Sequence, residues 1–251
     1  NIWDEVTLEK VAKHCQLSVT HFSRLFKEQT GESVYAFIKR IKMEQSALKL
    51  KMELQRDITE IGLDYGYSAS NYSSAFSQYH KRSPSQFRHQ FVKTDATTQK
   101  IIDTINSKIK IEIHGDYQVI YQRAIGNYKE MQEAWCQFVQ DNKEDITPET
   151  IFFERTFDDP TITHSDKCIY DICMTTKHPE KYKNRCILTG GKFAVYPFKG
   201  YMQEILPLHQ QLKGIWFPST QYEIDNRYTY DRYYLVRNDG YMEFDICIPI
   251  R

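Results

Sequence analysis

The sequence lacks the features that would mark a secreted, membrane-bound or metal-holding protein. It has no run of about 18 apolar residues that could span a bilayer, and no charged-then-apolar signal segment opens the chain. Six cysteines are scattered over 251 residues without a C-x-x-C pair. We therefore expect buried thiols kept reduced in the cytoplasm, no membrane partner, no metal site and no cofactor.

A catalytic constellation and a net charge are also missing. Among eight histidines no nucleophile, base and acid stand out together, so we expect no enzyme. The 33 basic and 33 acidic residues cancel, but they are unevenly spread: residues 1–94 hold 14 basic and 10 acidic residues, which leaves +4 there and −4 in the rest. This asymmetry fits a nucleic-acid-binding part joined to an acidic part.

The first ninety residues nearly repeat themselves at an offset of 50. The repeated positions are Leu8, Val11, Ala12, Ser18, Phe22, Phe26, Ser33 and Phe37, which return as Ile58, Ile61, Gly62, Ser68, Tyr72, Phe76, Ser83 and Phe87. A repeat of apolar positions and helix caps means one folding unit used twice.

Each copy of the repeat has the capping pattern of a helix-turn-helix. In the first copy Thr7 and Ser18 are candidate caps of two helices, and Gly31 ends the second helix. Ala12 and Gly62 are small enough for two helices to cross closely. The second copy repeats the scheme with Asp57, Ser68 and Gly66.

Residues 33 to about 53 predict a helix between the copies, because they contain no glycine or proline and keep a helical apolar pattern. Twenty residues at roughly 1.5 Å each span about 30 Å, close to the helical repeat of DNA at roughly 34 Å. Such a helix could hold two recognition helices in successive major grooves.

The second copy reads I-x-x-I-G-L-D-Y-G-Y-S-x-x-N-Y-x-x-A-F from Ile58, and S-P-S-Q-F-R follows from Ser83. In this it resembles the AraC/XylS-type transcription regulators, whose DNA-binding domain is two helix-turn-helix units joined by a long helix. Lys81 departs from the family's usual glycine, and a left-handed lysine costs about 1 kcal/mol, so we expect a distorted turn. Asn1 falls inside the family's first helix, so we expect residues to precede it.

The resemblance implies that the outward faces of both recognition helices touch DNA. These residues are Thr20, Ser23, Arg24 and Lys27 in the first copy, and Ser70, Asn71, Ser73, Ser74, Ser77 and Gln78 in the second. Arginine can pair bidentately with guanine, whereas serine discriminates little between base edges. We expect Arg24 to read sequence and the serine helix to fix position. Solvated helix faces are the alternative.

Residues 109–251 predict strands rich in aromatics, arranged as strand, helix, strand, strand twice over. Gly126, Tyr128, Glu130 and Met131 return as Gly200, Met202, Glu204 and Ile205 at an offset of 74. The fold class we expect is multidomain: an all-α tandem helix-turn-helix domain at 1–93, a linker at 94–108, and an α+β domain of two pseudo-symmetric halves at 109–251 with helices on one face of antiparallel sheet.

This second part resembles the GyrI-like effector-binding domain. The resemblance is carried by Phe152 and Phe153, the stretch Phe157–Pro160, Tyr170, Asp171 and Cys173, Gly190–Gly200, Gly214–Tyr222, and Tyr230–Tyr233. It implies a groove lined by aromatics that holds lipophilic, often cationic compounds, with Asp231 where the family usually has glutamate.

A pocket of this kind also follows from the residues themselves. Eighteen tyrosines, fourteen phenylalanines and three tryptophans supply faces for cation–π contact, and a buried carboxylate among them would select positive charge. The candidate effector-binding residues are Trp135, Tyr170, Trp216, Asp231 and Tyr233. Core packing is the alternative for each aromatic, and a surface pair with an arginine is the alternative for Asp231.

The order of the two domains resembles the Rob-type subgroup of AraC regulators. It implies a bacterial, nucleoid-associated regulator, an activator by resemblance, with double-stranded DNA, a small-molecule effector and RNA polymerase as partners. Two alternatives of other classes stay open: a GyrI-like hydrolase that uses a pocket carboxylate and tyrosine, and an interaction module that titrates another protein.

Overall fold

A computed structural model of the chain describes residues 7–91, 95–127 and 131–251. The expectations for Asn1, Tyr128 and Glu130 fall outside these residues. The chain divides into two compact units, the first of residues 1–50 and 54–90 and the second of residues 51–53 and 91–251. Among the described residues, no helix is long and apolar enough to cross a membrane.

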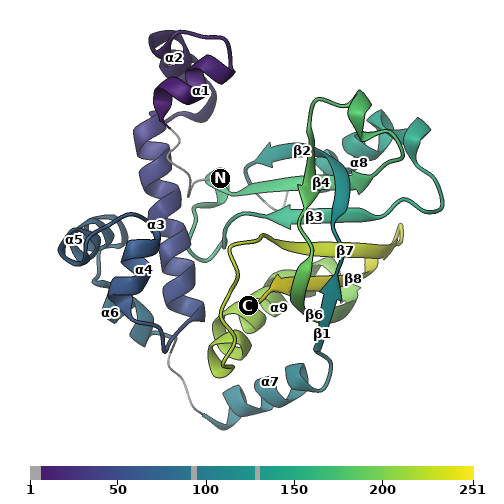
Figure 1. Ribbon diagram of the computed structural model, residues 1–251. Coiled ribbons are helices and arrows are strands. Elements are labelled where there is room, and N and C mark those ends of the chain that lie inside the picture. The colour runs from purple at the N-terminus through teal and green to yellow at the C-terminus, as the bar shows by residue number, and fades with distance from the viewer. Residues whose placement is uncertain (1–6, 92–94, 128–130) are drawn as a thin grey trace. The chain divides into compact units, whose positions relative to one another are not determined.

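The first unit is all helical, as the sequence predicts. Its helices are α1 (Leu8–His14), α2 (Val19–Thr30), α3 (Val34–Met52), α4 (Ile58–Asp64), α5 (Ala69–His80) and α6 (Pro84–His89). Helices α1 and α2 lie at the amino end of α3, and α4 to α6 lie beside its carboxyl half (Figure 1). The nineteen residues of α3 give a rod of about 28 Å at 1.5 Å per residue.

The close helix crossing is present, and so are the predicted cap hydrogen bonds except that of Ser68, which precedes α5 but makes no side-chain cap bond. The side chains of Thr7, Ser18 and Asp57 accept hydrogen bonds from the first turns of α1, α2 and α4, which satisfies amide groups that a helix start leaves open. A Cβ placed on Gly62 would lie 2.7 Å from Cγ of Tyr72. Gly62 is therefore the residue that lets α4 and α5 meet.

The turn after α5 is not distorted, so that expectation is wrong. Lys81 adopts the left-handed conformation at φ 60° and ψ 20°, close to Gly31 at φ 74° and ψ 0° after α2. Its Nζ reaches back 2.9 Å to the carbonyl oxygen of Gln78. The left-handed backbone of the lysine costs free energy, but its side chain donates a hydrogen bond to a carbonyl that the helix end leaves without a partner.

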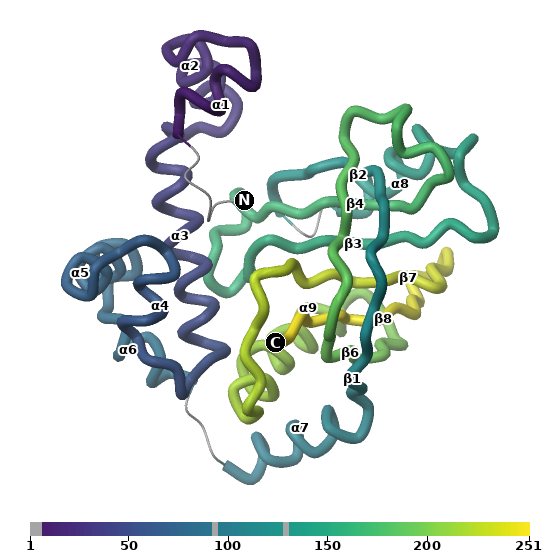
Figure 2. Tube along the Cα trace, viewed as in Figure 1, coloured from purple at the N-terminus to yellow at the C-terminus, as the bar shows by residue number. Residues whose placement is uncertain are grey.

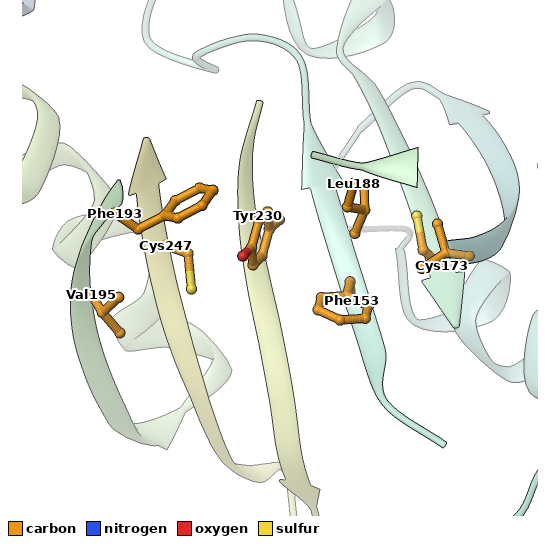
Figure 3. Packing of buried hydrophobic residues seen from close by; sticks show 8 residues of the cluster. Phe153, Cys173, Leu188, Phe193, Val195, Tyr230 and Cys247 are labelled. Atoms are coloured by element: carbon orange, nitrogen blue, oxygen red, sulfur yellow. The ribbon is translucent and has the colours of Figure 1, made fainter. Parts of the chain in front are cut away.

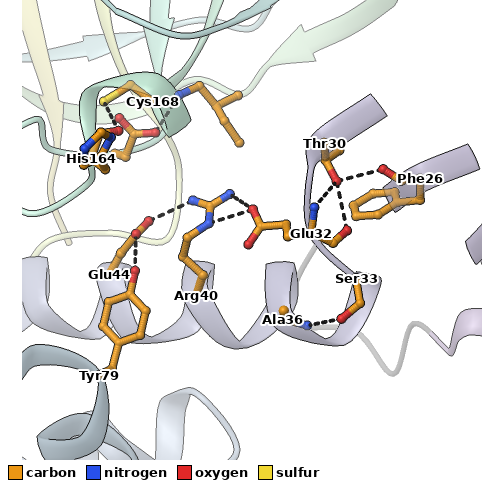
Figure 4. A network of polar contacts seen from close by, with 12 residues as sticks. Phe26, Thr30, Glu32, Ser33, Ala36, Arg40, Glu44, Tyr79, His164 and Cys168 are labelled. Atoms are coloured by element: carbon orange, nitrogen blue, oxygen red, sulfur yellow. Dashed lines mark hydrogen bonds and ion pairs between the residues drawn. The ribbon is translucent and has the colours of Figure 1, made fainter. Parts of the chain in front are cut away.

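A polar network joins α3 to both copies of the repeat. Arg40 donates to Glu32, in the turn before α3, at 2.8 and 2.9 Å, and to Glu44 at 3.1 Å. The hydroxyl of Tyr79 on α5 donates to the other oxygen of Glu44 at 2.6 Å (Figure 4). The side chains of α3 therefore fix both recognition helices relative to one rod.

The second unit is α+β, as predicted. Its strands are β1 (Lys110–His114), β2 (Tyr117–Ile125), β3 (Phe152–Thr156), β4 (Ile169–Thr175), β5 (Arg185–Leu188), β6 (Gly191–Tyr201), β7 (Thr229–Val236) and β8 (Tyr241–Pro249). Its principal helices are α7 (Ala96–Asn106), α8 (Met131–Asp141) and α9 (Met202–Gln211), with a π-turn at Leu212–Trp216. Strand β5 was not predicted, because four residues are too short for a clear alternation.

The two halves of the second unit are pseudo-symmetric, which confirms the doubled pattern. The eight strands form one antiparallel sheet in the order β1-β6-β8-β7-β3-β4-β2-β5. The strands β3 and β7 run side by side in its middle (Figure 2). Each half contributes its edge strand to the other: β1 pairs with β6, and β5 pairs with β2. The pseudo-twofold axis that relates the two halves therefore passes between β3 and β7.

One face of the sheet is an apolar core that runs across it (Figure 3). Its buried residues are Val119, Phe153, Cys173, Leu188, Phe193, Val195, Tyr230 and Cys247. Asp171, fully buried, accepts hydrogen bonds there from Arg123 and Arg155. Helices pack on the opposite face of the sheet. In the core on that face, Phe138 of α8 packs on Ile172 and Met174 of β4.

Candidate functional site

The candidate DNA-binding residues lie on α2 and α5, the second helix of each copy. Eight of the ten are exposed, and Ser23 and Ser77 are half-buried. The exposed ones are Thr20, Arg24, Lys27, Ser70, Asn71, Ser73, Ser74 and Gln78. Of the aromatic residues that repeat between the copies, Tyr72 and Phe76 of α5 are fully buried, whereas Phe22 and Phe26 of α2 are half-buried. The two helices thus present polar faces of matching position and unequal charge.

The side chains on these faces differ in how firmly they are held. Arg24 is 69% exposed and lies 3.9 Å from Glu28, one helical turn on; such exposed pairs contribute little. Gln78 accepts a hydrogen bond from Nζ of Lys39 on α3 at 3.1 Å. Arg24 is therefore available to another molecule, whereas Gln78 is held by α3.

Two buried carboxylates meet in the middle of the sheet of the second unit. Glu154 of β3 and Asp231 of β7 are directly opposite each other in the strand pair, and they are 5% and 3% exposed. Directly opposite residues of an antiparallel pair have Cβ atoms about 5 Å apart. The pair lies on the face that carries the helices, because Glu154 also pairs with Ile172.

Aromatic rings surround this carboxylate pair. The ring of Trp135, on α8, lies 5.3 Å from that of Tyr233 and 6.2 Å from that of Phe152, both in edge-to-face geometry. The Tyr233 ring lies 4.8 Å from that of Phe244. The hydroxyl of Tyr233 donates to Glu154 at 3.3 Å. Aromatic faces around anionic groups are the surroundings that a lipophilic cation prefers.

Burial and like charge shift the protonation of the pair. Burial, together with the nearby charge of Asp231, raises the pKa of Glu154 to about 8, although hydrogen bonds from Trp135 and Tyr233 oppose the rise. Burial and the two carboxylates also hold the pKa of Tyr233 well above its usual range. At neutral pH Glu154 thus keeps its proton, since two adjacent buried carboxylates do not both ionise readily.

Asp231 is only partly satisfied. Its Oδ2 lies 3.2 Å from Nε2 of His209, on α9, while its Oδ1 is buried and has no hydrogen-bond partner. An unpaired buried carboxylate oxygen is costly. This atom is the point in the site where a bound positive group would gain most.

The structure brings together three of the five candidate effector residues, Trp135, Asp231 and Tyr233. Tyr170 lies beside them in the core beneath α8, on which Trp135 also packs. Trp216 lies elsewhere: it is buried in the π-turn, and its indole nitrogen donates to Asn106 of α7 at 2.8 Å.

Glu154 and His209 were not predicted as site residues, although the internal repeat contained the signal. Adding 77 to Glu154 gives Asp231, and adding 74 to Trp135 gives His209. The two carboxylates and the two rings are thus equivalent positions of the two halves. Each ring approaches the carboxylate of its own half.

The rings of Trp135 and His209 cover Glu154 and Asp231 in this structure. A cavity of about 380 Å³ lies at the carboxyl end of α8, with Phe138, Asn142 and Tyr182 among its lining residues, and neither carboxylate lines it. Since His209 is 14% exposed over Asp231, a ligand that reaches the carboxylate has to move this ring. Within the described ranges, no group of three or more His, Cys, Asp or Glu side chains could hold a metal ion.

Comparison with known proteins matches both units. Residues 11–90 match the family model of a helix-turn-helix domain, and residues 107–251 match that of the GyrI-like small molecule binding domain. The multiple antibiotic resistance protein MarA of Escherichia coli is 33% identical over 89 residues, which are 35% of this chain and 69% of MarA.

Further relatives match one unit each. The transcriptional activator RhaR of Mannheimia succiniciproducens is 29% identical over 94 residues, which are 37% of this chain and 34% of RhaR. This chain covers about a third of the length of the first such relatives. An integron cassette protein of Vibrio cholerae aligns with 57% of this chain and 96% of its own at a TM-score of 0.42 and 16% identity.

RhaR bears the name of a transcriptional activator, and the larger matched part of the chain is a small-molecule-binding module. The tandem helices of the first unit and the doubled sheet of the second agree with these matches. The chain belongs to the GyrI-like family, and its amino-terminal unit is an AraC-type helix-turn-helix domain.

Proposed function

We propose that the chain is a sequence-specific DNA-binding transcription regulator whose second unit binds a small lipophilic cation. The observation that carries the effector class is the buried pair of Glu154 and Asp231 beneath Trp135 and Tyr233, with one oxygen of Asp231 unpartnered. A cation placed among these rings gains cation–π attraction and supplies the missing partner of Asp231.

The aspartate is one methylene shorter than the glutamate usual in the family, but the strand pairing compensates. Glu154 stands directly opposite and reaches into the same site. With Glu154 protonated, the pair carries a single negative charge at neutral pH. The site therefore fits a singly charged effector better than a doubly charged one.

In the first unit we assign sequence reading mainly to Arg24 and positioning to the serine face of α5. Arg24 is exposed on the outward face of α2, which is equivalent to the outward face of α5 in the second copy. Arginine makes bidentate contacts with guanine. The serines Ser70, Ser73 and Ser74 suit phosphate oxygens and either kind of base edge. RhaR is named a transcriptional activator, which supports an activator role for this chain.

Effector binding would reach the DNA-binding unit through the helix that carries His209. Helix α9 runs on into the π-turn Leu212–Trp216, and Trp216 donates a hydrogen bond to Asn106 at the end of α7. Helix α7 follows the first unit along the chain. If α9 shifts when the effector binds, the π-turn and the hydrogen bond from Trp216 to Asn106 pass this shift to α7. Helix α7 is the segment that leads to the DNA-binding unit.

The test is selection of DNA by the full chain from random duplexes, with and without a panel of lipophilic cations. We expect one enriched sequence, with salt-dependent binding. Arg24→Ala should relax the preference at one base position and cost about 1–3 kcal/mol there, whereas Lys27→Ala should weaken binding evenly across sequences. Failure to enrich any sequence would contradict the proposal, as would an even loss on all sequences in Arg24→Ala.

A further inference from the structure

The two halves of the effector site differ at one pair of equivalent positions. Trp135 and His209 occupy the same place in α8 and α9, 74 residues apart, and each approaches the carboxylate of its own half. An indole is neutral at every physiological pH, whereas an imidazole can carry a proton. The half that contains Asp231 therefore has a group that can become a cation inside the site.

His209 lies within hydrogen-bonding distance of the Asp231 carboxylate. Its Nε2 lies 3.2 Å from Oδ2 of Asp231, and the two side chains are 14% and 4% exposed. A hydrogen bond between charged partners is stronger than one between neutral partners, and little solvent is present here to screen it. Oδ1 of the same carboxylate has no hydrogen-bond partner, so the imidazole pairs with only one of the two carboxylate oxygens.

Four other ionisable groups around the site keep their protons at neutral pH. From β7 the pKa of Tyr233 is raised well above its usual range, and from the opposite face of the sheet burial does the same for the thiols of Cys173 and Cys247. Across the strand pair Glu154 keeps its proton up to about pH 8.

We propose that protonated His209 is the resident cation of the effector site, and that a cationic effector binds by taking its place on Asp231. This role of His209 rests on the proposed function and deepens it. The effector arrives with its positive charge, the bond between His209 and Asp231 breaks, and the proton of the imidazole leaves to solvent. Charge is conserved in this exchange: one cation enters and one proton departs. The fraction of the protein that holds effector therefore depends on the ratio of the effector concentration to the proton concentration.

The probe is tetraphenylphosphonium, whose charge does not change with pH. Its dissociation constant for the full chain is measured by calorimetry from pH 5.5 to 7.5, in two buffers of different ionisation enthalpy so that released protons are counted. We expect affinity to rise by up to about tenfold per pH unit while His209 is protonated in the free protein, with close to one proton released. Tetraphenylborate, equal in shape and opposite in charge, should not bind.

Variants of His209 separate its proton from its packing. In His209→Gln and His209→Trp, the second of which copies the other half of the site, we expect affinity that is nearly independent of pH and little proton release. The matched control is His178→Gln, in the same unit and largely exposed, which should behave as the parent protein. A pH dependence in His209→Gln equal to that of the parent would overturn the inference and leave the proposed function standing.

Nuclear magnetic resonance of the histidine ring carbons provides a second readout. The His209 signal, identified by its loss in His209→Gln, should titrate at a lower pH when tetraphenylphosphonium saturates the protein, because Asp231 is then occupied. An unchanged midpoint with the cation bound would overturn the exchange. If the parent chain does not bind tetraphenylphosphonium at any pH, the proposed effector class itself fails, which is a different result.

Discussion

The raised pKa of Glu154 makes the stability of the second unit depend on pH in a direction that can be measured. The native pKa is about 8, against an ordinary value of 4.5. The folded state therefore keeps a proton that the unfolded chain loses above about pH 4.5. This contribution to stability is fully present below pH 4.5 and is lost as pH rises through 8.

The size of this loss follows from linkage. One proton bound only in the native state gives a slope of about 1.4 kcal/mol per pH unit, so raising the pH from 5 to 8 lowers the unfolding free energy by about 3–4 kcal/mol. Glutamine in Glu154→Gln keeps the shape and the acceptor for Tyr233 but binds no proton. We expect the variant to lose most of this slope and to exceed the parent in stability at pH 8.

The assay is urea unfolding followed by tryptophan fluorescence at pH 5, 6, 7 and 8. Trp135 and Trp216 both lie in the second unit, so the signal reports mainly on that unit. Asp231→Asn should reduce the slope in part, because it removes the charge that raises the pKa of Glu154. Glu133→Gln, exposed on α8, should leave the slope unchanged. An equal slope in the parent and in Glu154→Gln would refute the reasoning.

Three further substitutions test the packing of the two units. Gly62→Ala places a Cβ against the ring of Tyr72 and should cost about 2 kcal/mol, seen as a thermal midpoint about 10 °C lower. Lys81→Gly relieves a left-handed lysine and should raise the unfolding free energy of the first unit by about 0.5–1 kcal/mol. Asp171→Asn leaves the buried guanidinium of Arg155 without its carboxylate and should cost about 3–5 kcal/mol in urea unfolding.

Each of these has a matched control. Leu63→Ala, at the exposed position next to Gly62, should change the midpoint little. Gly31→Lys, at the equivalent turn of the first copy, should destabilise by about as much as Lys81→Gly stabilises. Asp239→Asn breaks an exposed pair with Arg237 and should cost less than about 1 kcal/mol. An equal change in Gly62→Ala and Leu63→Ala, or in Asp171→Asn and Asp239→Asn, would contradict the corresponding argument, as would a change of the same sign in Lys81→Gly and Gly31→Lys.

Local chemistry made most of the fold predictable. Ser18 and Asp57 are caps because their side chains accept amide hydrogen bonds at a helix start, and a sequence displays this directly. The small residue Gly62 at a repeated apolar position predicted the close crossing of α4 and α5. Lys81 was misjudged, because glycine preference measures only the backbone cost and omits the bond that the lysine makes to Gln78.

The candidate effector site was only partly predictable, because its members meet through strand pairing. The residue types of Trp135, Asp231 and Tyr233 suggest a role in the site one by one, but their adjacency depends on β3 lying beside β7. Glu154 looked like an ordinary polar position in an alternating strand, and nothing local marks it as buried. Trp216 is an aromatic residue in a loop that resembles the family's, but its indole nitrogen donates a hydrogen bond to Asn106 of α7.

The central claim is that a cation on Asp231 changes how the chain binds DNA. The direct measurement is the affinity of the full chain for its selected DNA site with and without tetraphenylphosphonium, in the parent and in Asp231→Asn. Allosteric coupling of the usual size predicts a change of about fivefold or more in the parent and no change in Asp231→Asn. An equal change in both proteins, or none in the parent, would contradict the account.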